Sequence, residues 1–316
     1  MRLRLVVRGM LGYLPGFLDS VKNRKEKTGT ISARYCYSVW LRHLVYLNES
    51  GMKSIPKKIA EIGPGASLGI GLSAVLSGVG TYFAFDIIRH SDSEKNLEVL
   101  EELILLFKNN TDIPDDSEFP NLYPKLDSYK FPKYILTENM LKNSLGAERL
   151  SKIREQIANP GKSINSDIQI NYKVPWFEDS VIQPETIDLI ISQAVLEHII
   201  DLEGAFRSMN KWLKTGGYVS HEIDYKAHET HKVWNGHWFY SKILWKIILK
   251  GRSYPINRQP HSYYIKLIND CGFSLVQEIK NTENNGYHEY SHKKKLSTYE
   301  DGDFIIKSAL LQGFKS

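Results

Sequence analysis

A glutamate and several glycines stand close together in KIAEIGPGASLGIG, residues 58–71. Gly63 and Gly65 have the spacing of a tight turn after a strand, but the dinucleotide pattern GxGxxG would need a glycine in place of Leu68. Glu61 is a second argument against a dinucleotide, because a carboxylate at the strand tip repels a pyrophosphate and attracts an ammonium group. The segment therefore predicts a site for a positively charged ligand.

An aspartate follows at the end of the next β-rich run, TYFAFDII, residues 81–88. Asp86 stands 21 residues beyond Gly65, where its carboxylate can accept hydrogen bonds from the two hydroxyls of a ribose. A solvated aspartate at a strand end is the alternative, and the preceding glycine turn disfavours it. A ribose joined to a cation points to S-adenosyl-L-methionine as the cofactor.

Strands that alternate with helices must position these residues. Helical spacing of apolar residues runs over 32–51, 68–79, 93–108 and 202–213, with further helical stretches in 137–158. Strand patterns occupy 59–62, 81–88, 168–174, 187–192, 218–224, 273–279 and 304–311. This order predicts an α/β fold, a Rossmann-like, doubly wound and mainly parallel seven-stranded sheet with helices on both faces.

The pattern divides the chain into two parts. Residues 1–55 form an expected N-terminal helical segment or cap, and residues 56–316 form the main domain. The proline-rich stretch 109–165 interrupts the alternation, so we interpret it as an insertion that could serve as a lid. The first 20 residues lack a cleavage site, and Arg8 interrupts their apolar run, which argues against a signal peptide or a membrane span. They either cap the domain or lie on a membrane, and capping is favoured.

Three motifs in order resemble the class I S-adenosylmethionine-dependent methyltransferases, in particular the small-molecule type. The motifs are AEIGPG, the strand end FAFD, and the block IDLIISQAVLEHIIDLEGAFRSMNKWLKTGGYV with its VLEH helix start and LKPGG-like turn. The resemblance covers about residues 59–88 and 168–225.

The resemblance implies roles for individual residues. Glu61 would serve the methionine amino group, Gly63 and Gly65 would let the backbone approach the cofactor, and Asp86 would bind the ribose. The methionine and sulfonium end would be lined by Ser192, Gln193 and Ala194. Two departures are present: Ser67 stands in place of a frequent third glycine, and the strand QINYKV lacks an acidic adenine contact. Adenine recognition is left unassigned.

The segment after the fifth strand, HEIDYKAHETHKVWNGHWFY, is dense in groups that can move protons. Methyl transfer from a sulfonium needs alignment of donor and acceptor, and an acceptor of high pKa also needs a general base. We favour Asp224, His228 and His237 as the catalytic set, although buried histidines often serve only packing. Arg258 and His261 could join them at the acceptor.

A metal site is an alternative interpretation of the same segment. His221, Asp224, His228 and His231 could supply ligands, but no compact motif such as HExxH occurs, so we predict no metal. His198 of VLEH is expected to fix the helix start rather than to act in catalysis.

Composition narrows the remaining choices. A net charge of +5 over 316 residues is a mild excess, and Cys36 and Cys271 are too few for a disulfide framework, which fits a cytoplasmic location. The expected partner is a small-molecule or glycan acceptor, with O-methylation slightly favoured; the oligomeric state is not readable. A nucleic-acid methyltransferase is disfavoured because SQAV stands where an NPPY-type motif is expected. A non-catalytic cofactor-binding protein is the other alternative.

Overall fold

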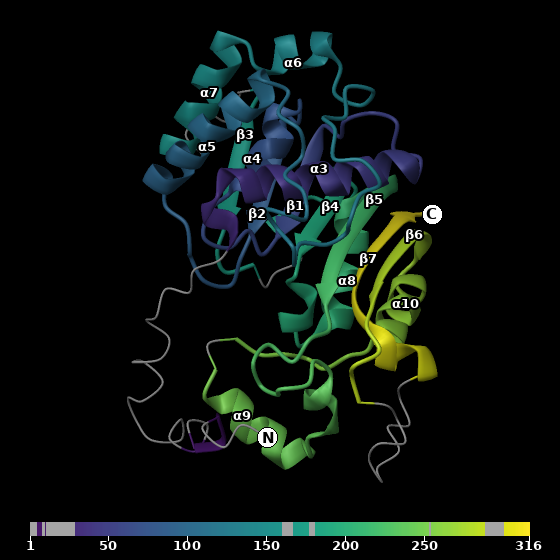
Figure 1. Cartoon of the computed structure of the whole chain (residues 1–316). Coiled ribbons are helices and arrows are strands. Elements are labelled where there is room, and N and C mark those ends of the chain that lie inside the picture. Colours follow the sequence, from purple (N-terminus) through teal and green to yellow (C-terminus); the bar gives the residue numbers. More distant parts are fainter. Residues whose placement is uncertain are drawn as a thin grey trace.

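The computed structural model describes residues 5–7, 10, 29–159, 167–176, 181–252, 254–287 and 300–316. Within these residues one seven-stranded sheet has the order β3-β2-β1-β4-β5-β7-β6 (Figure 1). The strands are β1 (Lys58–Ile62), β2 (Thr81–Phe85), β3 (Gln169–Lys173), β4 (Ile187–Gln193), β5 (Leu213–Asp224), β6 (Phe273–Thr282) and β7 (Ile306–Lys315). The first five pair in parallel, whereas β7 runs antiparallel to both β5 and β6. The predicted doubly wound, mainly parallel sheet is confirmed.

Helices cover both faces of the sheet, and the period of two along each strand decides which core a residue enters. Ile59 and Ile191 belong to a core with α3 (Ala33–Glu49), α4 (Gly69–Leu76), α5 (Ser93–Lys108) and α7 (Ala147–Ala158). Ala60 and Ile190, their chain neighbours, belong to a second core with α8 (Leu202–Trp212) and α10 (His261–Asp270). Helix α3 is thus part of the main core.

Helix α5 has its predicted bounds, and its N-cap Asp92 accepts a hydrogen bond from the amide of Lys95. Other predicted elements differ in detail from those observed. The stretch 137–158 forms two helices, α6 (Glu138–Ser144) and α7, separated at Leu145 and Gly146. Strand β5 begins at Leu213 rather than at residue 218, because Leu213 already pairs with Ile187 of β4.

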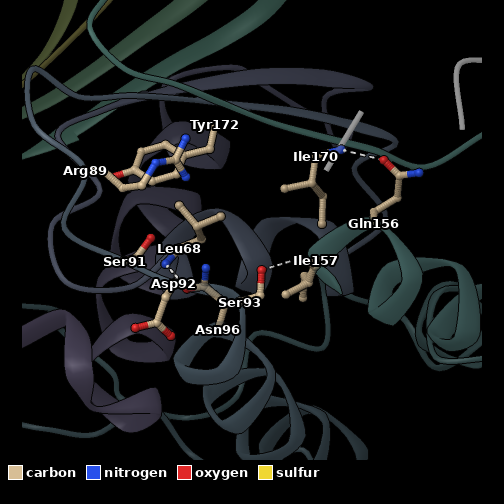
Figure 2. Close-up of a pocket in the computed structure, with 10 residues that line it drawn as sticks. All are labelled: Leu68, Arg89, Ser91, Asp92, Ser93, Asn96, Gln156, Ile157, Ile170 and Tyr172. Carbon is tan, nitrogen blue, oxygen red and sulfur yellow. Dashed lines mark hydrogen bonds between the residues drawn. The ribbon is translucent and has the colours of Figure 1, made fainter. Parts of the chain in front are cut away.

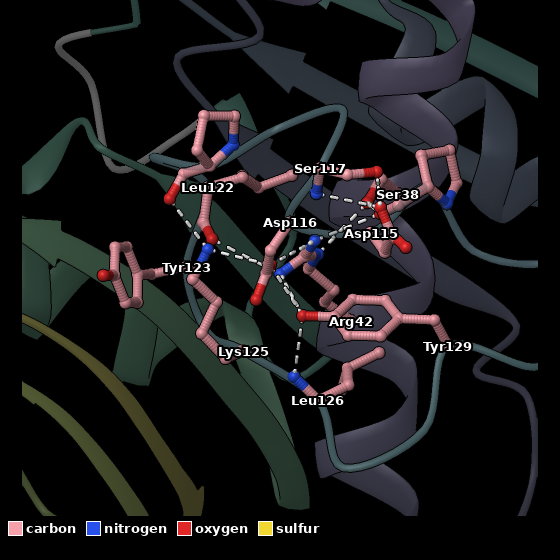
Figure 3. A network of polar contacts seen from close by, with 12 residues as sticks. Ser38, Arg42, Asp115, Asp116, Ser117, Leu122, Tyr123, Lys125, Leu126 and Tyr129 are labelled. Atoms are coloured by element: carbon pink, nitrogen blue, oxygen red, sulfur yellow. Dashed lines mark hydrogen bonds and ion pairs between the residues drawn. The ribbon is translucent and has the colours of Figure 1, made fainter.

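A buried arginine attaches part of the expected insertion to α3 (Figure 3). The fully buried guanidinium of Arg42 donates hydrogen bonds to the carbonyl oxygens of Pro114, Leu122 and Pro124, at 3.1, 3.3 and 2.7 Å. One of its nitrogens also lies 3.5 Å from a carboxylate oxygen of Asp116. These contacts fix the loop after α5 against the core. Residues 160–165 of the insertion lie outside the described residues, and a lid role stays a prediction.

The start of the chain contacts α9 (Lys242–Lys250), at one end of the molecule (Figure 1). Leu5 and Val6 pack with Trp245 and Ile248 of that helix. Within the described residues no helix combines the length and the apolar character needed to span a bilayer. Residues 1–4, 8–9 and 11–28 of the predicted cap lie outside the described part.

Candidate functional site

The direction of winding changes between two central strands, β1 and β4. β1 leads through α4 to β2 on one side, whereas β4 leads through α8 to β5 on the other, and β1 and β4 are neighbours. In open α/β sheets, ligands bind beyond the carboxyl ends of the strands where the direction of winding changes. The site is therefore expected at residues 62–68, 86–90, 192–199 and the segment after Asp224.

The turn after β1 requires glycine at two positions. Gly63 and Gly65 have φ angles of 72° and 75°, in the left-handed region that glycine adopts without strain. A Cβ atom on Gly63 would lie only 2.5 Å from the side chain of Val195, which follows β4. Ser67 is buried in the same turn, where its hydroxyl accepts a hydrogen bond from the amide of Gly69 and donates one to the carbonyl of Thr30. The serine that departs from the family pattern is thus a structural part of this turn.

Glu61 is buried beneath the first turn of α4. Its Oε2 accepts hydrogen bonds from the Tyr82 hydroxyl, at 2.5 Å, and from the Gly71 amide, at 3.1 Å. Burial raises the pKa of this carboxyl to about 8, despite the opposing effect of the two hydrogen bonds. The structure therefore ties Glu61 to α4 and β2, and a direct contact with a cofactor amino group stays a prediction.

Asp86 stands directly after β2, level with the glycine turn. It is 8% exposed, and its Oδ1 accepts a hydrogen bond from the amide of Ile87 at 2.8 Å. Burial raises the pKa of the carboxyl, while the amides of Ile87, Ile88 and Gly65 oppose the rise. The geometry leaves a partly accessible acceptor beside Gly65, which fits a diol such as that of a ribose.

A small cavity lies between α5, α7 and β3, just beyond the loop that contains Asp86 (Figure 2). The guanidinium of Arg89 lies 4.7 Å above the ring of Tyr172, and the side chain of Asn96 accepts a hydrogen bond from the amide of Leu68. The cavity is adjacent to the α4 side of the predicted cofactor site. No acidic side chain comes from β3 here, in agreement with the departure noted in the sequence.

The residues at the end of β4 connect the sheet with α3 and with the insertion. The hydroxyl of Ser192 is 2.8 Å from His221 Nδ1, and the Gln193 side chain contacts His43 and Glu222 and donates to the carbonyl oxygen of Tyr123. Ala194 has a φ of 52°, which is unusual for an alanine. Strain of this kind is common at binding sites. The predicted residues Ser192 and Gln193 end β4 and Ala194 follows it, and their contact with a cofactor stays a prediction.

The three predicted catalytic residues gather after β5. Asp224 forms an ion pair of 2.8 Å with Lys226, and His228 Nε2 lies 3.5 Å from the carbonyl oxygen of Asp224. His237, in the turn Gly236–Phe239, is 1% exposed, and its Nδ1 has no hydrogen-bond partner among the described residues. Asp224 and His237 both line a narrow cavity with Asn257. Burial lowers the pKa of His228 and His237, so both imidazoles are neutral near pH 7.

A buried carboxylate that sequence reasoning did not select belongs to the same cavity. Glu197, in η3 (Leu196–His198), is 2% exposed, and neither of its oxygens has a hydrogen-bond partner among the described residues. Burial raises the pKa of Glu197 well above its usual value, and the charges of Asp224 and Glu222 add to the rise. The backbone amides of Glu197 and Asp224 oppose the rise, although neither makes a hydrogen bond of normal geometry to the carboxyl oxygens. In the sequence, the feature that could have identified this site is the glutamate–histidine pair of VLEH, Glu197 and His198.

The remaining histidines have other environments. His221 is buried between Ser192 and the ring of Phe206, and a ring nitrogen of His231 contacts the backbone of Val233. His261 pairs with Glu278 at 2.5 Å. Among the described residues, His228 comes within ligand distance of Glu197 and His198, and not of His221 or His231. Among the described residues, the structure therefore does not bring His221, Asp224, His228 and His231 together as one set of metal ligands.

Part of the chain is similar to a known protein family: residues 136–220 match the model of a methyltransferase domain. Among solved structures, phosphoethanolamine N-methyltransferase 2 of Haemonchus contortus in complex with S-adenosyl-L-methionine is 14% identical, with a TM-score of 0.46, and the alignment covers 96% of this chain and 60% of that one. The same enzyme with phosphomonomethylethanolamine and S-adenosylhomocysteine is 14% identical, with a TM-score of 0.41 and coverages of 87% and 52%.

An S-adenosylmethionine-dependent methyltransferase of Mesorhizobium loti is 12% identical, with a TM-score of 0.43, and 88% of this chain aligns with 98% of that one. The chain spans only about half to three fifths of the length of the Haemonchus enzyme. No curated protein sequence matches the chain. These structural likenesses are distant. The sheet has an antiparallel β7 between β5 and β6 at one end of an otherwise parallel sheet, and residues 136–220 are similar to a methyltransferase domain.

Proposed function

We propose that the chain transfers a methyl group from S-adenosyl-L-methionine to a small-molecule or glycan acceptor, with a hydroxyl oxygen as the favoured attacked atom. The observation that carries the proposal is the pairing of the left-handed Gly63 and Gly65 turn with Asp86 at the end of the neighbouring strand. The turn lets the cofactor approach the backbone, and Asp86 supplies the acceptor for the ribose.

Glu61 supports the choice of a cationic cofactor through its buried carboxyl group. A carboxyl whose pKa is near 8 is mostly protonated at neutral pH. A sulfonium or ammonium group at the strand edge would favour its ionised form and so release a proton on binding. Ser192, Gln193 and Ala194 are proposed to line the methionine end of the cofactor.

The acceptor is proposed to bind over the cavity after β5. His237 is the favoured general base, because its imidazole is neutral and its Nδ1 has no hydrogen-bond partner among the described residues. His228 and Asp224 would orient the acceptor or share the proton. The aromatic rings of Trp238 and nearby residues would exclude water.

The test begins with isothermal titration of the chain with S-adenosyl-L-methionine and, in parallel, with NAD. A radiolabelled methyl-transfer screen then offers nucleotide sugars, lipid-linked glycans, small amines and RNA. Cofactor binding followed by methylation of a sugar or small molecule is the expected result. Binding without any methylated acceptor supports a non-catalytic protein, methylated RNA supports a nucleic-acid enzyme, and binding of NAD alone contradicts the proposal.

A further inference from the structure

Three side chains with metal-binding atoms meet beyond the carboxyl ends of β4 and β5. Glu197 and His198 come from η3, and His228 comes from the loop after β5. One ligand atom from each lies within 4.8 Å of the others. His228 and the following Glu229 both have positive φ angles, of 40° and 65°, so the loop takes an unusual path to bring the imidazole there.

Hydrogen bonding fixes the state of His198. Its Nδ1 lies 2.8 Å from the carbonyl oxygen of Pro255. A carbonyl only accepts, so Nδ1 must carry the proton, and in the neutral ring Nε2 then presents a lone pair. This Nε2 faces Oε1 of Glu197 at 3.9 Å. Two electron-pair donors are thus turned toward each other at a distance too long for a hydrogen bond.

His228 approaches the same oxygen. Its Nε2 lies 3.8 Å from Oε1 of Glu197 and 3.5 Å from the carbonyl oxygen of Asp224, a contact at the limit of a hydrogen bond that a metal ion on Nε2 would replace. Glu197 is buried and neither of its oxygens has a hydrogen-bond partner among the described residues, which is costly for a carboxylate. A buried carboxyl group between two imidazoles, without a hydrogen bond of its own, must therefore either keep a proton or bind a cation.

Nearby basic side chains do not supply that cation in the structure. Lys226 pairs with Asp224 at 2.8 Å, and Arg252 donates to the carbonyl oxygen of His228 at 3.1 Å while it lies over the ring of Tyr254. Among the described residues no lysine or arginine lies within ion-pair distance of Glu197.

A divalent metal ion matches the geometry. Zn²⁺ binds imidazole and carboxylate at about 2.0–2.2 Å in tetrahedral sites, which places neighbouring ligand atoms roughly 3.3–3.6 Å apart. The observed 3.8 and 3.9 Å need only a small inward shift of the side chains. The bond from His198 Nδ1 to the Pro255 carbonyl is also the usual outer contact that orients a metal-bound histidine.

We propose that Glu197, His198 and His228 bind one divalent transition-metal ion of the Zn²⁺ type, with a fourth position open to water or a ligand. Two imidazoles and one carboxylate favour such an ion over Mg²⁺ or Ca²⁺, which prefer oxygen ligands. Metal binding occupies His228, so His237 becomes the general base for methyl transfer. The metal site itself does not depend on the proposed acceptor.

The experiment uses the full chain without an affinity tag, stripped with EDTA and free of cofactor. Titration with ZnCl₂ followed by calorimetry should show one ion per chain, and Co²⁺ should give the absorption of a tetrahedral site. Glu197→Gln, His198→Gln and His228→Gln should each weaken Zn²⁺ binding by about 10- to 100-fold or more. The matched control, His231→Gln, changes a half-buried histidine of the same loop and should bind Zn²⁺ like the wild type.

Two further variants keep the test decisive. His228→Cys should restore a ligand and add a sulfur-to-Co²⁺ charge-transfer band, which a misfolded chain does not produce. His288→Gln with His292→Gln removes histidines outside the described residues and should leave binding unchanged. A wild type without stoichiometric Zn²⁺, or a folded His228→Gln variant with wild-type affinity, overturns the proposal. None of these readouts uses methyl transfer, so failure of the proposed function would be seen separately.

Discussion

The buried carboxyl groups on the β1–β2 side and on the β4–β5 side of the sheet differ in their hydrogen bonds. On the β1–β2 side, Glu61 is held by Tyr82 and Gly71, and Asp86 accepts from the amide of Ile87. On the β4–β5 side, Glu197 is equally buried but has no hydrogen-bond partner among the described residues. On the first side, hydrogen bonds within the protein satisfy the carboxyl groups. On the second, a buried carboxyl group with a raised pKa has no such partner among the described residues, which is typical of functional sites.

The largest expected effect concerns the acceptor side. Changing His237 to glutamine should lower turnover by about 10²–10⁴-fold, because a general base contributes that much, while cofactor affinity changes little. The measurement is the methylation rate with the acceptor found in the screen, beside a calorimetric titration. His261→Gln serves as the control, since His261 is satisfied by Glu278 outside the cavity. Normal turnover in His237→Gln would remove it from the site.

The attachment of the insertion provides the next test. Arg42→Ala should lower the free energy of unfolding by about 3–5 kcal/mol, because several buried carbonyl groups lose their donor. Arg34→Ala is the matched control: Arg34 also joins α3 to the same loop, but through an exposed pair with Glu118 that contributes about 1 kcal/mol or less. Urea denaturation measures both. Equal decreases in the free energy of unfolding would show that the buried contacts of Arg42 stabilise the fold no more than the exposed ion pair of Arg34.

On the cofactor side, Asp86→Ala should weaken binding of S-adenosyl-L-methionine by about 1–3 kcal/mol, since the ribose hydroxyls lose their acceptor in a partly closed site. Glu94→Ala, an exposed carboxylate in the first turn of α5, should leave the affinity unchanged. Isothermal titration calorimetry measures the cofactor affinity of both variants. An unaltered affinity in Asp86→Ala would separate this residue from the cofactor.

The last prediction concerns the pH dependence of stability. Folding raises the pKa of Glu61 from 4.5 to about 8, so the folded chain keeps a proton that the unfolded chain releases. Stability is therefore lost as pH rises from about 4.5 to about 8. Glu61→Gln should show a flatter decline, though a partial one, because the pKa of Glu222 is raised in the same direction. Urea denaturation at several pH values measures the slope. An identical slope in the variant would show that Glu61 is ionised in the folded protein.

Local patterns predicted the sheet, the glycine turn and the placement of Asp86 at a strand end. These features depend on the spacing of apolar residues and on backbone conformations that only glycine takes freely, as at Gly63. The environment of Glu197 could not be read in this way. It results from the meeting of η3 with the loop that carries His228, and no spacing within one segment records that contact. The role of Arg42 was missed for the same reason, since its partners lie more than 70 residues away.

Strand β7 lies between β5 and β6, and this placement governs how the protein can be made. On the ribosome, β5 is synthesised long before β7, and until then its outer edge presents backbone groups that any other extended chain could pair with. The nascent protein would therefore depend on chaperones, or on rapid release, during the last part of translation. Slow synthesis over residues 225–305 would increase the time in which such mispairing can occur.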